Sequence, residues 1–249
     1  MFGKVVLRAL CVLAAGGLCS CGNPAGAGPA SKSAAGPATW PAKLADGQWR
    51  DLFDGKTLKG WKVSAFGGGG RSYVKDGAIH IDRGESCSGV TWADGNDLPR
   101  EDYELFAEAQ RVADTDFFCG LTFPVGKDCM TLVPGGWAGS ITGLSCINGY
   151  DASDNATTKV IDFKNGEWYQ FRVRVTKGHI VVYVDDKETI RVARKGKKIS
   201  VRMEVEPSQP LGIATWQTHG AVKAVRMRKL SQAEIRAAAE EAAQDTVSE

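Results

Sequence analysis

The sequence predicts an all-β fold, in which two antiparallel sheets pack as a sandwich and a C-terminal helix follows. Three observations support this prediction. Between Trp49 and Leu230 short runs of alternating apolar and polar residues are separated by turn residues every few positions. No apolar stretch of helical period interrupts these runs, so the chain offers no crossover helices for a parallel sheet. The 30 glycines among 249 residues suit a fold with many turns.

The first strands form the clearest pair. In residues 72–81 the dipeptide Asp76-Gly77 lies between two alternating runs, which is a strong signal for a tight hairpin. Residues 184–187 indicate a second tight turn. With the further runs, about a dozen strands are expected, as in a sandwich or barrel. These further runs are residues 103–112, 117–123, 129–133, 140–144, 159–163, 168–176, 179–184, 187–192, 199–205, 212–219 and 222–230.

Alternation within a strand assigns its two faces. In residues 103–112 it turns Leu105, Ala107 and Ala109 toward the core. The opposite face then carries Glu104, Phe106, Glu108 and Gln110. The predicted shared core consists of Phe53, Trp61, Leu105, Trp168, Phe171, Val173 and Val182.

The last element differs from the rest. Residues 231–234, Ser-Gln-Ala-Glu, form a capping box that opens a helix rich in Ala and Glu through about Ala243. Because the helix has few large apolar residues, we expect a solvated appendage. The expected organisation is a signal peptide at 1–20, a tether at 21–45, the sandwich at 46–230, and the helix with its tail at 231–249.

The N-terminus has the features of an export signal. Lys4 and Arg8 precede an apolar stretch that is too short to span a bilayer. The residues Leu18-Cys19-Ser20-Cys21 resemble a bacterial lipobox, in which Cys21 receives the lipid. This predicts a lipid-anchored protein in the periplasm, at the outer membrane or at the cell surface, with no membrane contact except through the anchor. The alternative is cleavage by ordinary signal peptidase and release as a free secreted protein.

Charge and cysteine content exclude some classes. Without Lys4 and Arg8 the mature chain has 31 − 2 = 29 basic residues against 29 acidic ones, so no basic excess exists for nucleic-acid binding. After export four cysteines remain, an even number in an oxidising compartment. Cys129 and Cys146 flank a predicted turn and are expected to pair, which leaves Cys87 to pair with Cys119; buried free thiols are the alternative. No Cys-x-x-Cys spacing predicts a structural metal.

A family resemblance rests on several segments. Residues 51–61 read Asp-Leu-Phe-Asp-Gly-Lys-Thr-Leu-Lys-Gly-Trp and resemble the opening signature of the 3-keto-disaccharide hydrolase domain family. Later landmarks match in the right order, at 166–169, at 184–186 and at 217–220 ahead of 225–230. The resemblance covers nearly the whole domain. It implies a concanavalin-A-like jelly roll, an exported bacterial setting, and cleavage of glycosides whose sugar has first been oxidised at C3.

The implied reaction needs a base near C2 of the sugar, a partner for the enediolate oxygen and an acid for the leaving group. We expect five residues to converge on one concave face. Glu108 is the candidate base, and His219 is the acid or enediolate partner. Gln217 is a hydroxyl donor, Trp137 a stacking platform, and Asp151 a rim-loop ligand.

Each assignment has a plainer alternative. Glu108 can be a solvated strand residue, His219 can simply bond backbone, and the loop 148–155 around Asp151 can be an Asx turn rather than a site for sugar hydroxyls or a divalent cation. Three function classes therefore stay open: an enzyme acting on an oxidised glycoside, a non-catalytic carbohydrate-binding module, and an envelope structural or interaction protein. A carboxylate and a His within reach of each other in the groove favour the enzyme; aromatic rings without such a pair favour the module.

Overall fold

The computed structural model describes residues 47–94 and 98–247. The chain divides into two units, Met1–Ala34 and Ala35–Glu249. The predicted signal peptide, the lipidation site at Cys21 and the tether lie outside the described residues. Within the described part, no helix is long and apolar enough to cross a membrane.

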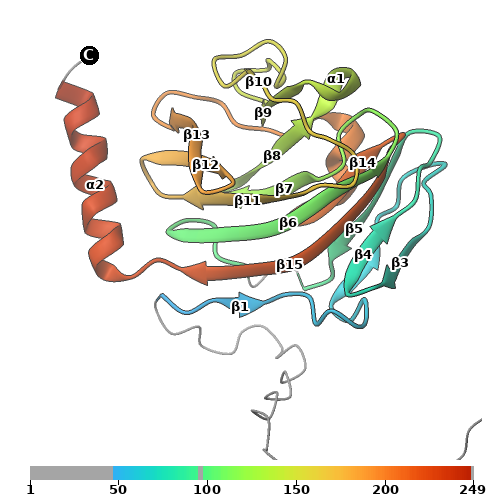
Figure 1. Cartoon of the computed structure of the whole chain (residues 1–249). Coiled ribbons are helices and arrows are strands. Elements are labelled where there is room, and N and C mark those ends of the chain that lie inside the picture. Colours follow the sequence, from blue (N-terminus) through green and yellow to red (C-terminus); the bar gives the residue numbers. More distant parts are fainter. Residues whose placement is uncertain (1–46, 95–97, 248–249) are drawn as a thin grey trace, which may run out of the picture. The chain divides into compact units, whose positions relative to one another are not determined.

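Two antiparallel sheets form the domain (Figure 1). The eight-stranded sheet has the order β13-β12-β11-β6-β15-β4-β3, with β1 paired to β15. Its strands are β1 (Arg50–Asp51), β3 (Ser72–Lys75), β4 (Ala78–Ile81), β6 (Tyr103–Ala113), β11 (Trp168–Val175), β12 (His179–Val184), β13 (Lys187–Ala193) and β15 (His219–Lys229).

The seven-stranded sheet has the order β10-β9-β8-β7-β14-β5-β2. Its strands are β2 (Trp61–Val63), β5 (Cys87–Trp92), β7 (Gly120–Val125), β8 (Asp128–Gly135), β9 (Ile141–Ser145), β10 (Lys159–Val160) and β14 (Gly212–Trp216). Three short or terminal elements complete the fold: α1 (Gly136–Gly139), η2 (Met203–Ser208) and α2 (Gln232–Val247). The predicted all-β sandwich with a C-terminal helix is confirmed.

Local sequence explains the two tightest connections. Asp76 and Gly77 join β3 to β4 with φ values of 50° and 77°, and Asp185 and Asp186 join β12 to β13 with 47° and 61°. A two-residue turn with two positive φ values matches the right-handed twist of the strands it joins. Both hairpins therefore form where the sequence predicts them.

The core lies between the two sheets. Leu105, Ala107 and Phe171 come from the eight-stranded sheet, and they share one buried cluster with Leu121 and Met130 from the seven-stranded sheet. Of the predicted core, Phe53, Trp61, Leu105, Phe171, Val173 and Val182 are buried.

Trp168 is a correction to the predicted core. It lies an odd number of positions from Phe171, so the two-residue period of β11 turns it to the outer face, where Lys223 Nζ lies 4.1 Å from the ring centroid. The predicted strand at 199–205 is also wrong. After a single bridge at Ile199, the chain enters η2 at Met203.

The predicted disulfides are not present, because all four described cysteines are buried free thiols. In the β8–β9 register Thr131 pairs with Ser145, so Cys129 and Cys146 are out of step by one residue and belong to opposite faces of the sheet. Cys119 lies in the main core, whereas Cys87 belongs to a smaller cluster on the other side of the seven-stranded sheet. No shift of side chains alone joins either pair.

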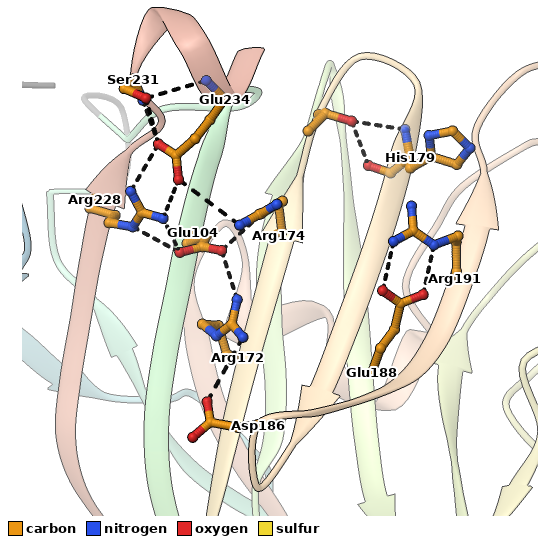
Figure 2. Close-up of polar contacts among 11 residues, drawn as sticks. Glu104, Arg172, Arg174, His179, Asp186, Glu188, Arg191, Arg228, Ser231 and Glu234 are labelled. Carbon is orange, nitrogen blue, oxygen red and sulfur yellow. Dashed lines mark hydrogen bonds and ion pairs between the residues drawn. The ribbon is translucent and has the colours of Figure 1, made fainter. Parts of the chain in front are cut away.

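A buried carboxylate organises the outer face of the eight-stranded sheet (Figure 2). Glu104 is 1% exposed. Its Oε1 accepts hydrogen bonds from Arg172 Nη1 at 2.9 Å and Arg174 Nε at 2.8 Å, and its Oε2 accepts one from Arg228 Nε at 2.8 Å. Three neighbouring strands, β11, β6 and β15, are thereby joined through one side chain.

Helix α2 docks on the same face and is not the solvated appendage that its composition suggests. The predicted capping box is present, with Ser231 N donating to Glu234 Oε2 at 2.8 Å. Glu234 also accepts a hydrogen bond from Arg228 at 2.7 Å. Further along the helix, Glu241 pairs with Arg191 at 2.8 Å. Because no described residue of α2 is fully buried, these polar contacts rather than apolar burial hold the helix.

The contact through Glu234 makes helix docking dependent on pH. The Arg228 hydrogen bond lowers the pKa of Glu234 from an ordinary value of 4.5 to about 2. A carboxylate with a lowered pKa stabilises the folded form above its unfolded pKa and loses that contribution as the pH falls. We therefore expect amide exchange in residues 232–240 to quicken between about pH 4.5 and pH 2. The variant Glu234→Gln serves as a control, since its exchange at neutral pH should already match the acid form.

Candidate functional site

A cleft of about 220 Å³ opens on the outer face of the seven-stranded sheet. Alternation in β8 and β9 sends Met130, Leu132 and Leu144 into the core and leaves Thr131 and Ser145 for the cleft. The segment containing η2 and the turn labelled α1 supply the walls. The lining residues are Cys87, Asp116, Phe117, Thr131, Val133, Trp137, Ser145, Arg202, Glu204, Val205 and Trp216.

Backbone geometry places Trp137 at the rim of this cleft. Gly135, Trp137 and Ala138 have positive φ values of 68°, 50° and 62°, so the chain reverses sharply between β8 and β9. The side chain of Asp116 holds the turn, since its Oδ2 accepts a hydrogen bond from Ala138 N at 2.9 Å and its Oδ1 accepts one from Phe117 N at 2.7 Å. The indole is 38% exposed as a result. Asp116 is therefore a positioning residue for Trp137.

This role of Asp116 is open to a direct test. In Asp116→Ala the amide of Ala138 loses its acceptor, so we expect faster hydrogen exchange in residues 136–139 and a looser Trp137. Hydrogen exchange read by mass spectrometry measures the change. Asp114→Ala removes a nearby carboxylate that bonds Arg83 instead, and it should leave the turn unaltered. Equal exchange in both variants would remove Asp116 from this role.

The charged side of the cleft is a fixed array. Arg202 donates to Glu204 through Nε at 3.2 Å and Nη2 at 2.8 Å, and to Asp151 through Nη1 at 2.6 Å. The hydrogen bond to Glu204 raises the pKa of Arg202, and the same bond lowers the pKa of Glu204. Both groups are therefore charged at neutral pH. The Arg202 guanidinium lies 6.0 Å from the centroid of the Trp137 ring.

The floor of the cleft is less polar. Thr131 Oγ1 lies 2.9 Å from Thr122 Oγ1, and Ser145 Oγ lies 3.4 Å from Cys146 Sγ. Burial raises the pKa of the Cys87 thiol to about 12, so this thiol is neutral and a weak nucleophile. The cleft thus combines aromatic walls, two hydroxyls and one charged array.

A family model described as 3-keto-alpha-glucoside-1,2-lyase-like domain matches residues 89–231, more than half of the chain. The chain belongs to this family. The resemblance of residues 51–61 and the later landmarks to the 3-keto-disaccharide hydrolase domain family is thereby confirmed. No curated protein matches the chain.

Solved structures show the same sandwich at low identity. The apo Crh5 transglycosylase is 12% identical, with 74% of this chain and 84% of that chain covered and a TM-score of 0.51. A structure from work on endo-acting O-glycanases of human gut microbiota is 15% identical, covers 77% of this chain and 97% of that chain, and has a TM-score of 0.49. The carbohydrate-binding module CBM66 from Bacillus subtilis is 11% identical, with 68% and 96% covered and a TM-score of 0.43.

The five residues predicted for the site do not converge in this member of the lyase-like family. Trp137 lines the cleft, and Asp151 lies behind it, bonded to Arg202. Gln217 points away, since its Nε2 donates to the Glu85 carbonyl at 2.7 Å beside a glycine-rich loop. The predicted concave face that gathers all five is therefore wrong.

Glu108 and His219 lie on the outer face of the other sheet. Glu108 pairs with Lys223 at 3.2 Å, and His219 Nε2 lies 3.2 Å from His80 Nδ1. In the β6–β15 register His219 stands opposite Ala113, five residues along β6 from Glu108. At about 3.3 Å per residue the two groups are roughly 16 Å apart, too far to act on one sugar carbon. The geometry does not support them as a catalytic pair.

Sequence reasoning missed Asp116, Arg202, Glu204 and the groove position of Trp216. The pair Arg202 and Glu204 was hidden because residues 199–205 look like a strand, in which alternate residues share a face but do not turn back over the sheet. Of Trp216 and Gln217, alternation indicates only that one faces a groove; the structure assigns that place to Trp216. Among the described residues no group of three or more His, Cys, Asp or Glu side chains is arranged to hold a metal ion.

Proposed function

We propose that the cleft beside Trp137 binds a carbohydrate. The observation that carries the proposal is an exposed indole, held rigidly at the rim of a cleft that also presents Arg202 and Glu204. The C–H bonds of a sugar ring pack well on the electron-rich face of an indole, while its hydroxyls need fixed donors and acceptors. Membership of a carbohydrate-active domain family supports the same conclusion.

A second candidate is cleavage of a 3-keto-glycoside by elimination, and the Arg202–Glu204 pair is the observation that favours it. Glu204 would take the proton from C2, the C1–O bond would break as the C1–C2 double bond forms, and the leaving oxygen would take up a proton from water. Arg202 has five N–H donors and three are occupied, so two remain for the oxygen on C3. Water adding across the enone would give the free 3-keto sugar.

Two features favour binding over cleavage. The pKa of Glu204 is lowered by Arg202, which makes this carboxylate a weaker base. None of the residues that line the cleft is a His, so the cleft presents aromatic rings without a carboxylate and His pair. Carbohydrate binding is accordingly the first proposal.

One set of measurements separates the two. Calorimetric titration with neutral methyl glycosides tests binding, and incubation with 3-keto-trehalose, followed by detection of 3-keto-glucose, tests cleavage. Binding without release supports the module. Release that falls by about 10²- to 10⁴-fold in Glu204→Gln supports the enzyme with Glu204 as base. If neither a glycoside nor 3-keto-trehalose binds, the proposed function is wrong.

We also propose that the domain acts at the cell envelope, tethered by a lipid on Cys21. Replacing Cys21 by Ala should move the protein from the membrane fraction to the soluble fraction, or leave it unprocessed, because a lipoprotein anchor needs that thiol. Fractionation with immunoblotting measures the change. Cys19→Ala is a matched control that should retain the anchor. Unchanged membrane partition of Cys21→Ala would contradict the anchor.

A further inference from the structure

The charge of the cleft limits which sugars it can accept. Its lining contains two carboxylates, Asp116 and Glu204, against a single guanidinium, Arg202. Asp151 adds a third carboxylate directly behind Arg202 at 2.6 Å. Three negative charges and one positive charge give this array a net charge of −2. The thiol of Cys87 adds no charge of its own, because its pKa is raised to about 12.

Arg202 is also unable to receive an acidic group in the usual way. An arginine binds a carboxylate or sulfate best through two parallel N–H donors along one edge. Glu204 already occupies the edge formed by Nε and Nη2, and Asp151 occupies one donor of Nη1. The two N–H groups that remain can each serve a hydroxyl or carbonyl oxygen, but Nε is no longer free to form a paired edge.

The size of the cleft adds a second limit. Its volume of about 220 Å³ is below the roughly 300–1,000 Å³ of pockets that enclose drug-sized ligands. One sugar ring suits that space, with its face against Trp137 and its hydroxyls toward Glu204. A ring bearing an anionic group would place that group beside the carboxylates at close range, where like charges oppose binding.

We infer that the cleft selects one sugar ring without negative charge, that it rejects uronic acids and sulfated sugars, and that a free amine on the ring strengthens binding. This inference rests on the proposed carbohydrate binding and names the class of sugar. The amine gains because an ammonium group near a net negative array is stabilised, as is a cation beside an indole face.

The test uses matched probes and the full chain. Calorimetric titration compares methyl glycosides of glucose, galactose and mannose with the corresponding uronates and 2-amino sugars. For whichever neutral sugar binds, we expect the uronate to bind about tenfold or more weakly and the amino sugar several-fold more tightly. Salt should narrow both differences, because screening weakens charge interactions.

Two variants locate the effect. Glu204→Gln removes one charge and frees an edge of Arg202, so the discrimination against the uronate should fall several-fold. Glu206→Gln removes an exposed charge from η2 that does not line the cleft, and it should leave the discrimination unchanged. Equal affinity for neutral sugar and uronate would overturn the inference while the proposed function stands. Failure of every neutral sugar to bind would instead overturn the proposed function.

Discussion

Replacing Glu104 by Gln should lower the free energy of unfolding by about 3–5 kcal/mol, the typical cost of breaking a buried ion pair. Glu104 is 1% exposed and receives hydrogen bonds from Arg172, Arg174 and Arg228. A neutral amide leaves three partly buried guanidinium groups facing one another without their shared counter-charge (Figure 2). Their mutual repulsion adds to the loss of the charged hydrogen bonds.

Chemical denaturation and thermal unfolding both measure this effect. For a domain of this size the expected loss corresponds to a fall in melting temperature of about 10 °C. Glu188→Gln is the matched control, since Glu188 also pairs with an arginine in the same sheet, at 2.6 Å, but its side chain is 40% exposed. Exposed pairs contribute about 0–1 kcal/mol. Similar losses in the two variants would contradict the central role of Glu104.

Replacing Trp137 by Ala should weaken carbohydrate binding by about 30-fold or more, which corresponds to the 2 kcal/mol or larger effects of buried aromatic anchors at interfaces. The loss is expected in affinity and not in stability, because the indole is 38% exposed in the free protein. Removing it takes away the flat surface on which the sugar ring packs and opens one wall of the cleft.

Trp49 offers a closely matched control. It is also 38% exposed, but it lies over Phe106 and Arg226 on the eight-stranded sheet, away from the cleft. Trp49→Ala should retain full affinity in the same titration. If it binds as weakly as Trp137→Ala, or if both bind normally, the cleft is not the binding site.

The positions of turns and the faces of single strands follow from short-range rules. Asp76-Gly77 predicts its hairpin because only a few residues tolerate two positive φ values in succession. Alternation in residues 103–112 predicts that Leu105 faces inward, and Ser231 with Glu234 predicts the start of the helix. Trp137 is recognisable as a candidate because a glycine-rich turn leaves a large ring outside any core.

The composition of the site depends on pairings that are distant in sequence. Alternation predicts that Glu108 points outward, but it does not specify the sheet, and strand order places it on the far side from Trp137. The cysteines show the same ambiguity, because a shift of one residue in register decides whether two thiols share a face. Arg202 and Glu204 reach the cleft only because the segment through η2 turns back over β5 and β14, to which no local pattern points. Local periodicity thus determined which residues alternate and turn, whereas the tertiary fold decided which of them meet, since contacts between sheets depend on the order and register of strands far apart in the chain.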